Sequence, residues 1–96
     1  MELKLSQAAL DGLVGKLARG EAGQVIRVYL AGIGCGGGGR PSFSLVLDQP
    51  QATDKTVELP GITVYYDKLI PMHTEKLEIT YDPARHETEQ FKVNVI

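Results

Sequence analysis

Residues 26–47 contain the stretch that decides the fold, and they spell IRVYLAGIGCGGGGRPSFSLVL. Apolar residues alternate with others over 26–30 and again over 43–47, which is the period of a β-strand with one buried face. Six of the eight residues from 32 to 39 are glycine. The stretch therefore predicts two strands joined by a glycine-rich loop, and this loop holds Cys35, the only cysteine of the chain.

Upstream of this stretch, residues 6–19 predict a helix. Its apolar residues recur at helical spacing: Leu10, Leu13, Val14 and Leu17. Ser6 is the expected N-cap, because its hydroxyl can accept a backbone N–H, and Gly20 is the expected stop in the left-handed conformation. Gly12 and Gly15 should each weaken the helix by up to about 1 kcal/mol relative to alanine. We therefore expect the helix to depend on packing against a sheet.

Downstream, alternation and turn residues predict four further strands, over 56–59, 62–66, 77–81 and 91–95. Pro60-Gly61 is a turn between the first two, and Pro71 interrupts a segment that predicts a short helical turn or a loop. One helix followed by about six short strands predicts a single mainly β domain over residues 1–96. The expected architecture is a β-sandwich or flattened barrel of mixed sheets with an N-terminal helix.

Charge and hydropathy exclude several classes of function. The net charge is −2 and the basic residues are scattered from Lys4 to Lys92, so the clustered basic face of a nucleic-acid-binding protein is missing. No stretch approaches the ~20 apolar residues of a membrane span, and the N-terminus lacks the apolar core of a signal peptide. A single cysteine cannot form an internal disulfide, so we expect a reducing, cytoplasmic location. From the charge and the lack of a long apolar stretch, we expect no nucleic-acid partner and no membrane partner.

The glycine-rich loop is the candidate for chemistry, and its first interpretation is dinucleotide binding. Gly32-x-Gly34-x-x-Gly37 formally matches the fingerprint. That motif works only where a helix N-terminus follows to receive the pyrophosphate, whereas Pro41 and a strand follow here. A P-loop is rejected as well, because no Gly-Lys-Ser/Thr closes the run.

The second interpretation is a metal or cluster ligand. Soft thiolates suit iron–sulphur clusters, zinc and Cu(I), and successive backbone N–H groups in a glycine-rich turn stabilise anionic sulphur. Gly34, Gly36 and Gly37 would support such a site, because they carry no side chains that keep a bulky ligand away from Cys35. One cysteine cannot complete a four-thiolate site, so other ligands must come from a second subunit, another protein, a small thiol or nearby oxygen and nitrogen groups. The third interpretation is a hairpin whose cysteine is incidental.

Other residues add less to the site. His73 is the better supplementary metal ligand of the two histidines, because its irregular segment can fold toward the loop, whereas His86 lies in a charged turn. Arg40 could screen an anionic cluster. No paired carboxylates and no Ser-His-Asp arrangement with a nucleophile elbow indicate catalysis, so a binding protein is expected rather than an enzyme.

Several segments together carry a family resemblance: a helix of the type Leu-Ser-x-x-Ala-x-x-x-Leu, the stretch from Ile26 to Gly37, Pro60-Gly61-Ile62-Thr63-Val64 and Phe91-Lys92-Val93-Asn94. On these residues the chain resembles the HesB/IscA-like family, the A-type iron–sulphur cluster carriers. The resemblance implies a β-rich fold of two mixed sheets with a helix, and homo-oligomerisation. It also implies transient binding of iron or a 2Fe–2S or 4Fe–4S cluster for delivery to apo-proteins.

The chain departs from that family in two places. Gly36 and Gly37 follow Cys35 where the family usually has Gly-Cys-Ser-Gly, and the sequence ends at Ile96 without the Cys-Gly-Cys of full carriers. It therefore resembles a divergent, short member. The resemblance implies an assembly accessory protein that binds iron or a cluster through Cys35, shared between subunits, with apo iron–sulphur proteins or a cluster scaffold as partners. The alternatives are a thiol redox protein that uses Cys35 as an activated thiolate, or a degenerate member that acts as an interaction module.

Overall fold

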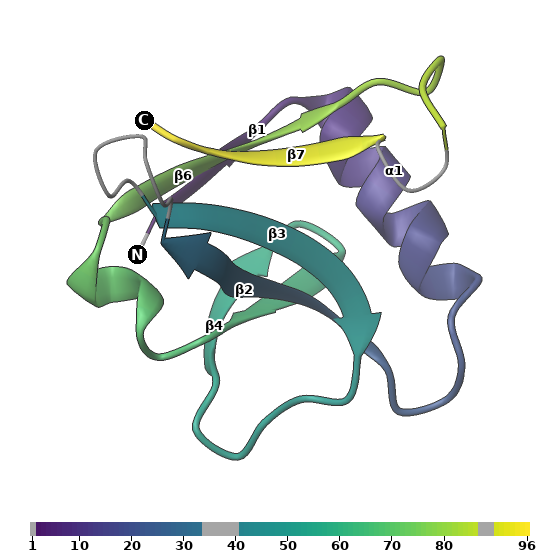
Figure 1. Cartoon of the computed structure of the whole chain (residues 1–96). Helices are drawn as coiled ribbons and strands as arrows, with labels where there is room; N and C mark the ends of the chain where they lie inside the picture. Colours follow the sequence, from purple (N-terminus) through teal and green to yellow (C-terminus); the bar gives the residue numbers. More distant parts are fainter. Residues whose placement is uncertain (1, 34–40, 87–89) are drawn as a thin grey trace.

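The computed structural model describes residues 2–33, 41–86 and 90–96. Its elements follow the order β1 (Glu2–Leu5), α1 (Gln7–Ala18), β2 (Val25–Ile33), β3 (Pro41–Asp48), β4 (Lys55–Leu59), β5 (Ile62–Tyr66), the 3-10 turn η1 (Ile70–Met72), β6 (Lys76–Tyr81) and β7 (Phe91–Val95). Figure 1 shows the strands curling around a common interior, with α1 along one side.

The strands form one mixed sheet in the order β1-β6-β7-β3-β2-β5-β4. The sheet curves into a nearly closed barrel, and its edge strand β1 faces the β4–β5 turn across a groove lined by Leu3, Leu5, Leu10 and Leu59 among others. The predicted mainly β fold with an N-terminal helix and a flattened, mixed barrel is therefore confirmed. All seven strands belong to a single sheet, where the family resemblance implied two.

Strand β1 is an element that the sequence analysis did not predict. It pairs in parallel with β6, from Glu2 opposite Lys76 to Leu5 opposite Ile79, and Leu3 is buried. The alternation of Glu2 and Lys4 with Leu3 and Leu5 is the strand pattern. The pattern extends over only four residues. Without knowledge of the partner strand, so short a pattern cannot be distinguished from the irregular chain that precedes a helix.

The hydrophobic core lies inside the curved sheet, where the inward-facing positions of each strand meet α1. Its fully buried members are Leu13, Val28, Ile26, Val64, Ile70, Leu77 and Ile79. Those on the strands follow the predicted period of two, Leu13 is one of the predicted apolar positions of α1, and Ile70 comes from η1. The core therefore contains inward-facing positions that the alternating pattern marks, although Val95 at the end of β7 is exposed.

The N-cap of helix α1 is the predicted one, but Gly20 after its end does not have the predicted left-handed conformation. The Ser6 hydroxyl accepts a hydrogen bond from the Ala9 N–H at 3.2 Å, so the predicted N-cap is confirmed. Gly20 is not left-handed, since the positive φ angles among the described residues belong to Gly23 and Gly61. A Cβ at Gly20 would lie 3.2 Å from a methyl of Leu47 and from the Leu17 carbonyl oxygen, so close packing explains this glycine.

Helix α1 packs against the sheet beside the wedge where β3 and β7 diverge. β3 and β7 are paired at Phe43 and Val93 in the described part of the chain, whereas β2 and β3 are paired along their whole length. The rings of Tyr81 and Phe91 stack at 4.7 Å on the β6–β7 side of the wedge. They contact the helix at Gly12, where a Cβ would lie 3.0 Å from Cζ of Phe91. Gly12 therefore allows the close approach of helix and sheet, and its low helix propensity is the cost.

The two helix glycines should respond differently to alanine. In Gly15→Ala the new Cβ meets only the Arg19 guanidinium at 3.5 Å, an ordinary contact. This variant should gain about 0.5–1 kcal/mol in free energy of unfolding from helix propensity. Gly12→Ala forces Tyr81 and Phe91 apart, and overpacking of about 1–3 kcal/mol should exceed that gain. Urea unfolding measures both, and equal stabilisation by the two variants would contradict this account.

Candidate functional site

The predicted site residues Cys35, Gly34, Gly36, Gly37 and Arg40 lie outside the described residues. The structure does describe where the chain enters and leaves their loop. β2 ends at Ile33 and β3 begins at Pro41, and these two residues are paired in the antiparallel ladder. We call this end of the barrel the loop end, and its surroundings define the candidate site.

The β2–β3 ladder changes register just before the loop. The shift falls between Leu30 and Gly32, and beyond it Gly32 pairs with Ser42. The Ser42 hydroxyl also donates a hydrogen bond to the Gly32 carbonyl oxygen at 3.2 Å. The two strands are thus held together up to the last described residue on each side of the loop.

The parallel pairing of β2 with β5 brings a second segment to the loop end. Ile26 pairs with Val64 and Val28 with Tyr66, so the chain leaves β5 in the same direction as β2. The Asp67 N–H then donates to the Val28 carbonyl oxygen at 3.1 Å, and η1 follows with Ile70 fully buried. Figure 1 shows η1, in green, at the end of the barrel where β2 ends.

His73 caps η1, so it lies on the segment that the topology brings to the loop end. Its backbone N–H donates to the Ile70 carbonyl oxygen at 2.9 Å, and its side chain is exposed. His86 lies beyond the end of β6, which is the opposite end of the barrel. No group of three His, Cys, Asp or Glu side chains within the described ranges could hold a metal ion, and ligation by His73 stays a prediction.

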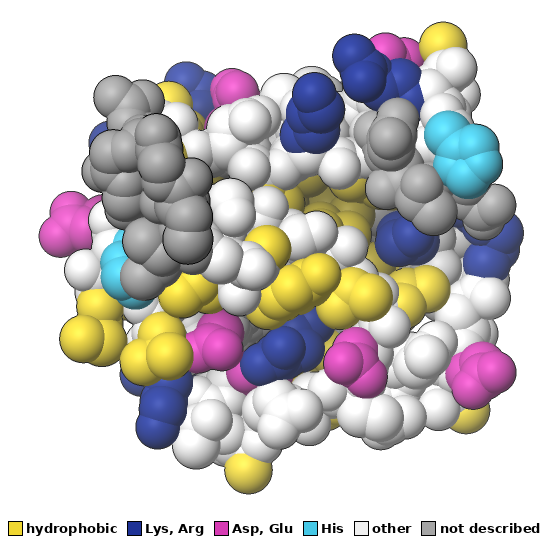
Figure 2. All heavy atoms as spheres, in the orientation of Figure 1, with side chains coloured by type: hydrophobic (Ala, Val, Ile, Leu, Met, Phe, Trp, Pro, Cys, Tyr) yellow, Lys and Arg dark blue, Asp and Glu magenta, His cyan; other side chains and the backbone are white. Residues whose placement is uncertain are grey.

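The loop end also carries most of the exposed large hydrophobic side chains. β7 runs antiparallel to β3 with Val93 opposite Phe43, so its last residues lie beside the start of β3. Four of the five exposed large hydrophobics of the described chain lie here, on η1 or at the end of β7: Leu69 (43% exposed), Met72 (77%), Val95 (51%) and Ile96 (59%). Figure 2 shows hydrophobic side chains exposed at this end of the molecule, on the left. Contiguous exposed apolar surface is typical of interaction sites, so these side chains are candidates for contact with a partner.

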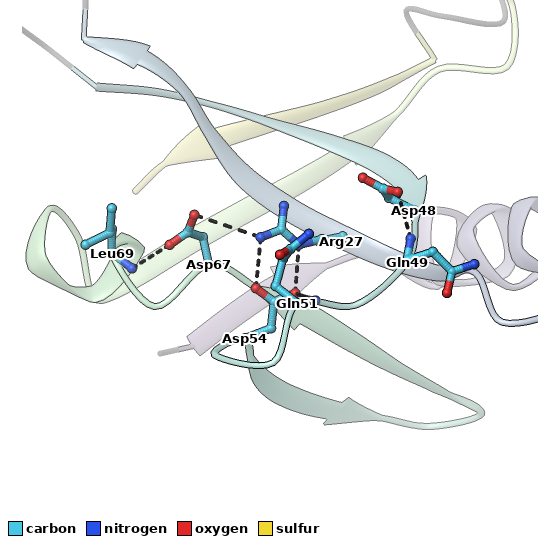
Figure 3. Close-up of polar contacts among 7 residues, drawn as sticks. All are labelled: Arg27, Asp48, Gln49, Gln51, Asp54, Asp67 and Leu69. Atoms are coloured by element: carbon cyan, nitrogen blue, oxygen red, sulfur yellow. Dashed lines mark hydrogen bonds and ion pairs between the residues drawn. The ribbon is translucent and has the colours of Figure 1, made fainter.

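A polar network on the outer face of β2 holds η1 in position (Figure 3). Arg27 Nε and Nη2 donate to Oδ2 and Oδ1 of Asp54 at 2.7 and 2.9 Å, and the Asp54 side chain is only 1% exposed. Arg27 Nη2 also lies 3.9 Å from Oδ2 of Asp67. The other oxygen of Asp67 accepts the Leu69 N–H at 2.8 Å. One guanidinium thus joins β2, the β3–β4 connection and the entrance to η1.

The bidentate pair changes the acidity of both partners. The hydrogen bonds from Arg27 hold the pKa of Asp54 below its ordinary value, with a further contribution from the Gln51 N–H, which donates at 2.9 Å. The same hydrogen bonds raise the pKa of Arg27. Sequence reasoning missed this network, because an arginine on the outer face of a strand is the ordinary pattern for a solvated side chain. Its partners lie 27 and 40 residues further along the chain.

Comparison with known proteins agrees with the resemblance. The family model described as iron–sulphur cluster biosynthesis matches residues 1–94. No curated protein sequence matches the chain. In the part of the chain that the structure describes, no helix is long and apolar enough to cross a membrane.

Removal of the Asp54 charge should lower stability in a pH-dependent way. Because the folded-state pKa of Asp54 is depressed, its contribution is present above the unfolded-state pKa of about 3.9 and is lost as the pH falls through the folded-state pKa. Asp54→Asn should lower the free energy of unfolding by about 1.5–3 kcal/mol at about pH 7. Its difference from wild type should shrink below about pH 4.

Urea unfolding across this pH range checks the prediction, with Glu58→Gln as control for removal of an exposed carboxylate. A deficit for Asp54→Asn that stays constant down to about pH 2, below the usual carboxylate range, would contradict the ion-pair explanation.

Proposed function

Because the chain belongs to the iron–sulphur cluster biosynthesis family, we propose that it acts in cluster assembly as an accessory protein that binds iron or a cluster through Cys35. The family membership carries the general role in iron–sulphur assembly. Cys35 supplies the one thiolate of the chain, and thiolate is the ligand type that iron–sulphur clusters use. The iron or cluster is cargo, held for transfer to recipient proteins.

A second copy of the chain completes the ligand set in this proposal. One thiolate leaves three of the four positions of a cluster site unfilled, so ligands from outside the chain are required. A twofold interface with its axis near Cys35 would bring this residue from both copies together and supply two thiolates. His73 is the supplementary ligand that we propose from within the chain.

The apolar side chains at the loop end support this arrangement. Met72, Leu69, Val95 and Ile96 lie on the two segments that flank the β2–β3 hairpin, and their exposure is unfavourable in water. An interface that covers them would bury this surface and exclude water from the region where the loop leaves β2. Exclusion of water protects an iron–sulphur cluster from exchange of its ligands and tunes its potential.

Anaerobic reconstitution with ferrous iron and sulphide tests the ligand. Wild type should bind iron with the visible absorbance of a cluster, at about one 2Fe–2S cluster for two chains. Cys35→Ala should lose the absorbance, and His73→Ala should retain less iron than the matched control His86→Ala. Equal iron content in wild type and Cys35→Ala would sink the proposal.

The apolar loop end gives a separate prediction about assembly. Met72→Glu places a charge on the most exposed of these side chains, so it should shift the reconstituted protein from dimer to monomer and lower its cluster content. Val14→Glu is the control, because Val14 is also an exposed hydrophobic (40%) but lies on α1, away from the loop end. Size-exclusion chromatography with iron analysis measures both. A Met72→Glu variant that dimerises and loads like wild type would overturn the role of this surface.

A further inference from the structure

The divergence of β3 and β7 leaves a groove on the outer surface of the barrel. These strands pair at Phe43 and Val93 and then separate, and a groove of about 400 Å³ lies at the separation. Its lining residues come from β3, β7 and the turn before β7: Phe43, Ser44, Arg85, Phe91, Lys92, Val93 and Asn94. Figure 2 shows this hollow between β3 and β7, with hydrophobic atoms in its floor.

The chemistry of the groove is that of an anion site with an apolar floor. Arg85 and Lys92 supply two cations, and Ser44 and Asn94 supply neutral hydrogen-bonding groups. None of the described lining residues is acidic. A third cation lies close by, since Lys16 Nζ on α1 is 6.0 Å from the centre of the Phe91 ring.

Among the described residues, the carboxylate of Asp82 forms an ion pair with one of these cations. Asp82 Oδ2 lies 3.5 Å from Arg85 Nε, and both side chains are about half exposed. An exposed pair of this kind is weak and exchanges readily with solvent or with another carboxylate. The pair with Asp82 would therefore oppose binding of a ligand carboxylate to Arg85 only weakly.

The backbone on either side of the groove favours an extended occupant. β3 pairs with β2 as far as Asp48, but within the described chain its pairing with β7 is confined to Phe43. At Ser44 the β3 edge thus faces the groove rather than a neighbouring strand. Peptides bind at such edges by strand addition, in which main-chain hydrogen bonds supply affinity and alternate side chains supply specificity.

We propose that this groove binds an extended acidic segment of a partner protein. Carboxylates of the segment pair with Arg85 and Lys92, and the side chain between them packs on Phe91 and Val93. The proposal uses none of the residues proposed to hold iron or a cluster, so the two can fail separately.

The test is a titration of the full-length protein with a fluorescent eight-residue peptide of alternating glutamate and valine. Fluorescence anisotropy should show binding that weakens with salt, because exposed charges are screened. Amide NMR signals of Ser44, Lys92 and Asn94 should shift. Arg85→Glu and Lys92→Glu should each weaken binding about fivefold or more, while Lys55→Glu on β4 should leave it unchanged.

Three results would overturn the proposal. The first is equal binding of a peptide in which serine replaces glutamate. The second is equal weakening by Lys55→Glu, which would indicate a general charge effect. The third is inorganic phosphate shifting the same amide signals with the affinity of the peptide, which would make the groove a small-anion site. Circular dichroism confirms that each variant is folded, and unchanged iron loading of Lys92→Glu separates this surface from Cys35.

Discussion

The position of β2 between an antiparallel and a parallel neighbour is the constraint from which the candidate site follows. β3 returns beside β2 through the glycine-rich loop, so one side of β2 fixes where that loop leaves the barrel. β5 runs parallel to β2, so the chain that leaves β5 must emerge at the same end. A parallel pair needs a long crossover, and here the crossover contains β3 and β4. The end of β2 and η1 lie at the same end of the barrel because of this topology, although they are far apart in the sequence.

The Arg27 network reinforces this constraint with charge. Arg27 lies on β2 and forms ion pairs with Asp54 in the crossover and with Asp67 before η1. It therefore links the segments that the parallel pairing brings together. Because the Asp54 side chain is almost completely buried, loss of Arg27 would leave this carboxylate without its counter-ion and with little access to solvent. Ile70 is buried in the core, and Asp67 contacts Arg27 on the outer face of β2. The two contacts thus hold η1 from opposite sides of the sheet.

Much of the fold could be predicted from local pattern. Alternation located six strands and helical spacing located α1, because those periods depend only on which face is buried. β1 was missed because its four residues acquire strand character only beside β6. The low helix propensity of Gly12 is readable from the sequence, but its contact with Tyr81 and Phe91 depends on residues about 70 positions or more away. Gly20 was assigned a left-handed backbone that the structure assigns to Gly23 instead.

Part of the candidate site, too, could be predicted from local sequence, and part depends on the pairing of distant strands. Composition alone predicts chemistry at Cys35, and this stays a prediction. The parallel β2–β5 pair, which brings η1 with Met72 and His73 to the end of β2, could not be predicted in this way. The spacing of residues along the chain does not predict that β2 and β5 pair in parallel. The exposed apolar side chains at that end are equally invisible in the sequence, because alternation marks Val95 as an inward-facing strand residue.

The most direct test of the central claim is sedimentation velocity of the reconstituted protein, followed at the visible absorbance of the cluster. A cluster held between two Cys35 thiolates predicts that all of this absorbance sediments at the mass of a dimer, and that none is recovered with Cys35→Ser. Absorbance that sediments with the monomer, or that persists in Cys35→Ser, would contradict a cargo shared between two copies through this cysteine.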